Sequence, residues 1–196
     1  TTGVDALTHA VESYVTCMYN TDFTNRCCEE AVADIFKYLD RAYNDPNDME
    51  ARDGMLTASY KAGLAFTRTG VGYVHGIAHA LGGLYNTAHG LANSVILPIV
   101  LEDYGECVYP KLARLAETAG IKTDGSEPER ARAFIAAIRA MNKHLGLPTG
   151  FDFIKPEDYE TIAKWALAET NVNYPVPVLY DRTRLWHVLN RIVLEA

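Results

Sequence analysis

Apolar side chains recur at intervals of three and four residues along most of the chain, which is the period of an amphipathic helix. Near the start, Val4, Leu7, Val11 and Val15 follow this period, and Thr2 precedes them as a candidate N-cap. Alternating runs of Val, Ile and Thr, which would indicate strands, are nearly absent. The pattern therefore predicts an all-α, bundle-like domain of eight to nine helices over residues 1–196. The predicted helices are one that begins near Thr2 and others at roughly 24–43, 48–67, 74–85, 89–102, 105–119, 127–145, 156–168 and 181–194.

The composition is that of a globular protein. Of the 196 residues, 48% are apolar and 22% are charged, which is too apolar for a disordered chain. The net charge of −7, without a basic cluster, argues against a nucleic-acid partner. We find neither an apolar run long enough to span a membrane nor a signal-peptide pattern, so we expect a cytoplasmic protein.

Two further features concern the context in which the chain works. The four cysteines, at positions 17, 27, 28 and 107, lack Cys-x-x-Cys spacing, and we expect them to be reduced. The chain begins Thr-Thr-Gly, without a methionine, and runs directly into a helical pattern. This start leads us to expect a piece of a longer protein.

Ionisable side chains at ligand spacing occur in two short, otherwise apolar stretches. In "GVDALTHAVESY", Asp5 and His9 are four residues apart and so share one face of a helix. In "VHGIAHALGG", His75 and His79 repeat this spacing, and His89 follows at the predicted start of the next helix. One carboxylate with two or three imidazoles suits Fe(II), Zn(II), Mn(II) or Co(II). Because no thiolate belongs to the set, a catalytic site is favoured over a structural one.

Each pair also has a simpler interpretation. A histidine on an apolar helix face is commonly a core residue, and an acid near a helix N-terminus, such as Asp5, is favourable by itself. Both pairs nevertheless fall on strongly apolar helices, where a charge needs a partner, and together with His89 they favour a metal site. Gly76 replaces the glutamate of the metalloprotease His-Glu-x-x-His motif, which excludes that class of hydrolase. We expect His144 and His187 to lie outside the site, on surface helices.

Glycines surround the histidines, and they have two explanations. They could allow close packing of helices, or they could let the backbone approach a substrate or a flat cofactor ring. The glycines concerned are Gly70, Gly72, Gly76, Gly82, Gly83 and Gly90.

The two stretches resemble a known family. "GVDALTHAVESYV" and "GYVHGIAHALGGLYNTAHGLANSVILP" are similar to the C-terminal half of the iron-containing (group III) alcohol dehydrogenases. The His-x-x-x-His pair, the ten-residue step to Ala-His-Gly and the following Asn and Leu-Pro all match in order. The similarity is strong over residues 1–16 and 60–104 and generic elsewhere. It implies the all-α, dehydroquinate synthase-like C-terminal fold.

The resemblance also implies roles for five residues. Asp5, His9, His75 and His89 would bind the metal, Fe(II) or Zn(II), and His79 would lie near the nicotinamide and the substrate as a proton relay. In the whole enzymes, a preceding α/β domain binds NAD or NADP through a glycine-rich turn, and this chain contains no such unit. We therefore expect that domain to be the missing partner, and we expect the chain to be inactive without it.

The implied reaction interconverts a primary alcohol, diol or hydroxy acid and its aldehyde. The metal would lower the pKa of the substrate hydroxyl, and a hydride would pass to the nicotinamide. Ala88 stands where proline is usual, and the tail "NVNYPVPVLYDRTRLW" departs from the Asn-Pro-Arg of many members, which favours diol or hydroxy-acid substrates. Two alternatives are a zinc-dependent glycerol dehydrogenase-like enzyme and a non-catalytic helical domain that binds metal or packs against a partner. Apolar surface left by the missing domain would also allow a homo-oligomer.

Overall fold

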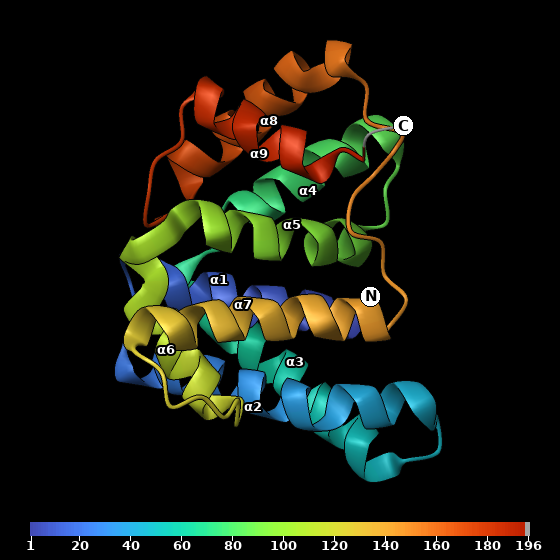
Figure 1. The fold of residues 1–196 in the computed structure, drawn as a ribbon, viewed down its shortest axis with the longest axis vertical. Helices are drawn as coiled ribbons and strands as arrows, with labels where there is room; N and C mark the ends of the chain where they lie inside the picture. Colours follow the sequence, from blue (N-terminus) through green and yellow to red (C-terminus); the bar gives the residue numbers. More distant parts are fainter. Residues whose placement is uncertain (195–196) are drawn as a thin grey trace.

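Nine α-helices and two short 3₁₀ helices make up residues 1–194, the part of the chain that the computed structural model describes (Figure 1). In chain order they are α1 (Thr2–Val15), α2 (Asp22–Asn44), α3 (Met49–Thr69), α4 (Tyr73–Tyr85), α5 (His89–Tyr104), η1 (Gly105–Val108), α6 (Tyr109–Thr118), α7 (Glu127–His144), η2 (Pro156–Asp158), α8 (Tyr159–Asn173) and α9 (Arg182–Ile192). Within the same residues, β-structure is limited to one bridge, between Phe151 and Val193. The prediction of an all-α fold is confirmed.

The structure corrects several predicted helix boundaries. The N-cap of α1 is Thr1, and Thr2 is already helical. The predicted helix at 105–119 is divided, because Gly105 has a left-handed φ of +65° that ends α5, and η1 intervenes before α6. The predicted helix at 156–168 starts late, after η2, and α8 then continues to Asn173.

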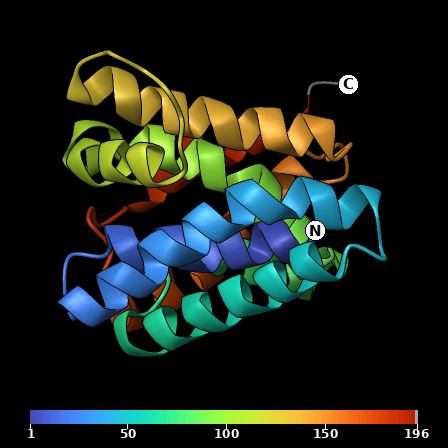
Figure 2. The same ribbon diagram turned by 90° about the horizontal axis from the view of Figure 1, so that it is seen from below.

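The helices are stacked in layers, with α5 near the centre. In Figure 1, α8 and α9 lie at one end, α4 and α5 follow, then α1 and α7, and α2, α3 and α6 lie at the opposite end. Helix α5 contacts α1, α4, α7 and α9, and α4 also packs against α8. Figure 2 shows α2 and α3 side by side along the outer face of α1. The starts of α1, α4 and α5 are thus brought together in the interior.

One continuous core takes apolar side chains from all nine α-helices. Residues 92–101 of α5 are buried without interruption, so this helix is apolar on every side. Pro98 cannot donate a backbone hydrogen bond to Ser94, and the amide of Asn142 on α7 satisfies the Ser94 carbonyl at 2.6 Å. No helix within residues 1–194 is long and apolar enough to cross a membrane.

Candidate metal centre

Four of the predicted site residues converge at the junction of three helices. Asp5 and His9 lie on one face of α1, His75 lies in the first turn of α4, and His89 is the first residue of α5. One oxygen or nitrogen ligand atom from each side chain lies within 4.8 Å of the others. Ligands of one Zn(II) ion lie about 2.0–2.2 Å from the metal, so modest side-chain adjustments would bring these four atoms around a single ion.

A fifth polar side chain, Asn93 on α5, points its amide nitrogen at the same place. Its Nδ2 lies 2.6 Å from Asp5 Oδ1, 3.2 Å from His75 Nε2 and 3.1 Å from His89 Nε2. The buried Oδ1 of Asn93 has no hydrogen-bond partner. An amide nitrogen carries two hydrogens and cannot donate to three neighbours at once. The protein therefore does not satisfy all hydrogen bonds of these inward-facing atoms. Such a group of ligand atoms is suited to a cation.

The charges of the cluster also suit a divalent cation. Besides Asp5, the carboxylate of Glu12 from the next turns of α1 reaches this region and bonds to His75. In the described residues, the ion pairs of both acids are with histidines, and neither pairs with Lys or Arg. Two buried or half-buried carboxylates without a basic counter-ion are costly unless a cation compensates them.

Burial favours the neutral, metal-binding form of two imidazoles of the cluster, those of His9 and His89. It lowers the pKa of His9 to about 4, with the neighbouring His75 adding to the effect and Asp5 and Glu12 opposing it. The His9 ring is stacked between Phe66 and His75, with ring centroids 4.4 and 4.5 Å away. Burial also lowers the pKa of His89. Neutral imidazoles have a free lone pair for a metal at neutral pH.

His75 is held on the side away from the cluster. Its Nδ1 lies 2.5 Å from Glu12 Oε2, and the other oxygen of Glu12 accepts the backbone N–H of Val74 at 2.9 Å. Sequence reasoning did not assign a role to Glu12. Its position three residues after His9, on the same helix face, was the available signal.

His79 lies one turn after His75 on α4, beside the cluster and outside the four-residue set. Its ring is stacked on His89 at 5.2 Å, and its Nδ1 lies 2.8 Å from Glu169 Oε1 on α8. The same Glu169 oxygen accepts the hydroxyl of Tyr174 at 2.7 Å. Glu169 and Tyr174 were also unassigned in the sequence, because nothing in the spacing links residues some 90 positions from His79.

A cavity of about 430 Å³ lies beside Phe66, and none of the four cluster residues lines it. Phe66, whose ring covers His9, forms part of its wall, together with Gly70 and Tyr174. The wall also includes the polar residues Thr67, Arg68 and Asn173, and the hydroxyl of Tyr174 bonds to Glu169.

The structure favours close packing as the explanation for three of the glycines. A Cβ on Gly76 would lie 2.2 Å from Thr170 Oγ1, and one on Gly90 would lie 2.9 Å from the carbonyl oxygen of Thr1. At Gly72 it would meet Glu12 Oε1 at 2.8 Å. Helix α4 can therefore approach α8, and Glu12 can approach α4, only because these side chains are missing.

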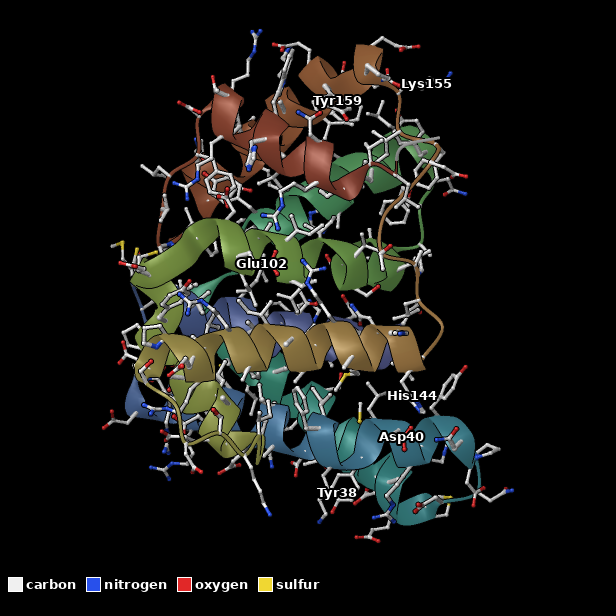
Figure 3. All side chains as sticks on the ribbon, viewed as in Figure 1. Tyr38, Asp40, Glu102, His144, Lys155 and Tyr159 are labelled. Atoms are coloured by element: carbon white, nitrogen blue, oxygen red, sulfur yellow. The ribbon has the colours of Figure 1, made fainter. Side chains whose placement is uncertain are left out.

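The two remaining histidines outside the cluster are on the surface, as expected. His187 is exposed on α9. His144, at the end of α7, lies 2.5 Å from Asp40 on α2, and Figure 3 shows this pair at the lower edge of the molecule. Neither belongs to the four-residue cluster.

The sequence is similar to known proteins over nearly its whole length. A family model described as "Fe-containing alcohol dehydrogenase family, C-terminal" matches residues 1–193. The NAD-dependent methanol dehydrogenase of Bacillus methanolicus is 38% identical over 185 residues, which cover 92% of this chain and 48% of that protein. Lactaldehyde reductase of Escherichia coli (strain K12) is 35% identical over 193 residues, or 95% and 49% of the two chains.

The fold is also similar to that of a solved structure. A crystal structure of a 1,3-propanediol oxidoreductase superposes with a TM-score of 0.92 and 34% sequence identity, covering 97% of this chain and 50% of that one. The chain thus spans about half the length of the relatives it matches.

Proposed function

Since this chain belongs to the Fe-containing alcohol dehydrogenase family, we propose that it is the metal-binding half of an NAD(P)-dependent alcohol dehydrogenase. The observation that carries the proposal is the convergence of Asp5, His9, His75 and His89, whose ligand atoms lie within 4.8 Å of one another. These four residues would hold Fe(II) or Zn(II), because imidazole and carboxylate ligands accept both ions. A bound ion would supply a Lewis acid that lowers the pKa of an alcohol hydroxyl.

The residues around the four ligands would prepare the site for hydride transfer. Phe66 and the core beneath α4 exclude water from one side of the histidines. His79 would accept the hydroxyl proton at its Nε2, because its Nδ1 is occupied by Glu169. Its side chain is 43% exposed, so the proton could then pass to solvent. The nicotinamide would come from a nucleotide-binding domain in the whole protein.

The relatives' names indicate the class of substrate. They are named for methanol, lactaldehyde and propanediol, which are all small and carry hydroxyl or aldehyde groups. We therefore propose a small primary alcohol or diol, or the corresponding aldehyde, as the substrate.

The proposal is tested by calorimetric titration of the chain with Fe(II) under anaerobic conditions and, separately, with Zn(II). We expect one ion per chain, and we expect Asp5→Asn and His75→Ala to abolish this binding. His144→Ala is the matched control, because His144 also pairs with an aspartate but lies on another face. An unchanged chain that binds no ion, or four proteins that bind equally well, would contradict the metal centre.

A further inference from the structure

Glu12 is the acid of α1 that the proposed ligand set does not use. It lies three residues after His9, and its side chain is only 2% exposed. A buried glutamate needs partners for both of its oxygens. Here both partners come from the start of α4, where His75 is located.

The two contacts of Glu12 determine which nitrogen of His75 carries the hydrogen. Oε1 accepts the backbone N–H of Val74 at 2.9 Å, and Oε2 lies 2.5 Å from His75 Nδ1. A carboxylate can only accept hydrogen bonds, so the hydrogen lies on Nδ1. The neutral ring then has its lone pair on Nε2, the nitrogen that lies 3.2 Å from Asn93 Nδ2 inside the cluster.

We propose that Glu12 is a positioning residue for His75, holding the hydrogen of the ring on Nδ1 so that Nε2 is free to bind the metal. The inference rests on the proposed metal centre and adds to it a residue outside the ligand set. Metal-binding histidines are commonly held in this way, and loss of the outer partner lowers metal affinity. With Asp5, the Glu12 carboxylate also supplies the second negative charge that balances a divalent ion.

The surroundings of Glu12 are adapted to this contact. Gly72 precedes α4 with a φ of −155°, outside the left-handed region, so a positive φ is not the reason for a glycine here. A Cβ at this position would lie 2.8 Å from Glu12 Oε1 and 3.4 Å from Tyr104 Oη. The missing side chain therefore makes room for the carboxylate.

Glu12→Gln tests the inference, and Asp40→Asn is the matched control, because Asp40 pairs with His144 outside the cluster. Glutamine has one acceptor oxygen. If that oxygen keeps the Val74 N–H, the amide NH₂ faces Nδ1 and shifts the ring hydrogen to Nε2. We expect Glu12→Gln to weaken Fe(II) and Zn(II) binding about 10–100-fold in calorimetry, with Asp40→Asn close to the unchanged chain.

The second measurement is ¹⁵N NMR of the histidine rings in the metal-free chain, at a pH where the imidazoles are neutral. We expect the hydrogen of His75 on Nδ1 in the unchanged chain and on Nε2 in Glu12→Gln. A hydrogen on Nε2 in the unchanged chain would overturn the inference even if the variant failed to fold. So would a folded Glu12→Gln chain that binds metal with unchanged affinity. An unchanged chain that binds neither ion would instead contradict the proposed metal centre.

Discussion

The two histidines of α4 each bond through Nδ1 to a glutamate from a distant helix, yet the two pairs are in very different environments. The His75 and Glu12 side chains are 3% and 2% exposed, and the nitrogen–oxygen distance is 2.5 Å. For His79 and Glu169 the exposed fractions are 43% and 30%, and the distance is 2.8 Å. The two histidines are one helical turn apart, yet the His75–Glu12 pair is shielded from water and the His79–Glu169 pair is in contact with it.

This difference shows that burial, more than the pairing itself, decides what a histidine–carboxylate pair can do. In the interior, each polar group keeps its orientation because an alternative partner is not available. Such a pair suits a ligand whose geometry must stay fixed. At the surface, water competes for both partners and the pair reorients at little cost. That environment suits a group that exchanges protons with solvent.

The largest expected effect comes from removing each carboxylate in the metal-free chain. Glu12→Ala leaves the Val74 N–H and the His75 ring without their buried acceptor, and we expect it to lower the free energy of unfolding by about 3 kcal/mol or more. Glu169→Ala should lower it by less than about 1 kcal/mol, because water replaces the lost oxygens. Urea unfolding of both variants measures the difference. Similar losses would show that burial does not separate the two pairs.

A smaller effect is expected from adding a methyl group at two glycines on the face of α4 that packs against α8. In Gly76→Ala the new Cβ meets the buried Thr170 Oγ1 at 2.2 Å and the Ala166 carbonyl oxygen at 3.3 Å, so we expect a loss of about 1–3 kcal/mol from overpacking. In Gly83→Ala the nearest atom is Trp165 Cζ3, at an ordinary 3.4 Å. This variant should gain up to about 1 kcal/mol from helix propensity. Thermal unfolding of both proteins tests the expected opposite signs.

The smallest effect, which leaves the fold unchanged, concerns the reactivity of a thiol where α2 packs against α1. Cys28 donates to Ser13 Oγ at 3.3 Å, next to Glu12 in the chain, and burial raises the pKa of the Cys28 thiol to about 12. Because thiolate is the reactive form, Cys28 should resist alkylation near neutral pH, whereas the exposed Cys17 should react. Mass spectrometry of peptides after timed treatment with iodoacetamide checks the order. Equal labelling of Cys28 and Cys17 in the folded chain would show that the contact between α1 and α2 does not protect the Cys28 thiol.

The sequence was most informative where a property is local. The spacing of apolar residues predicted all nine α-helices, because most of them are amphipathic and place their apolar side chains on one face, whereas α5 is buried on every side. The four-residue spacing likewise places Asp5 and His9 on one side of α1. Boundaries were less accurate where distant contacts decide them. Near the end of α8, for example, the side chain of Asn171 accepts the Tyr73 hydroxyl and donates to the Tyr180 carbonyl, a contact that no local signal indicates.

By itself, the sequence determined the helical fold class, the residues able to bind a metal and the resemblance that suggested their chemistry. Only the tertiary structure decided that the starts of α1, α4 and α5 meet, because that depends on packing between segments up to 88 residues apart in the chain. It also decided which glutamate joins which histidine. Glu12 and Glu169 are equally ordinary acids in the sequence, and the burial that separates their roles arises only when the helices pack.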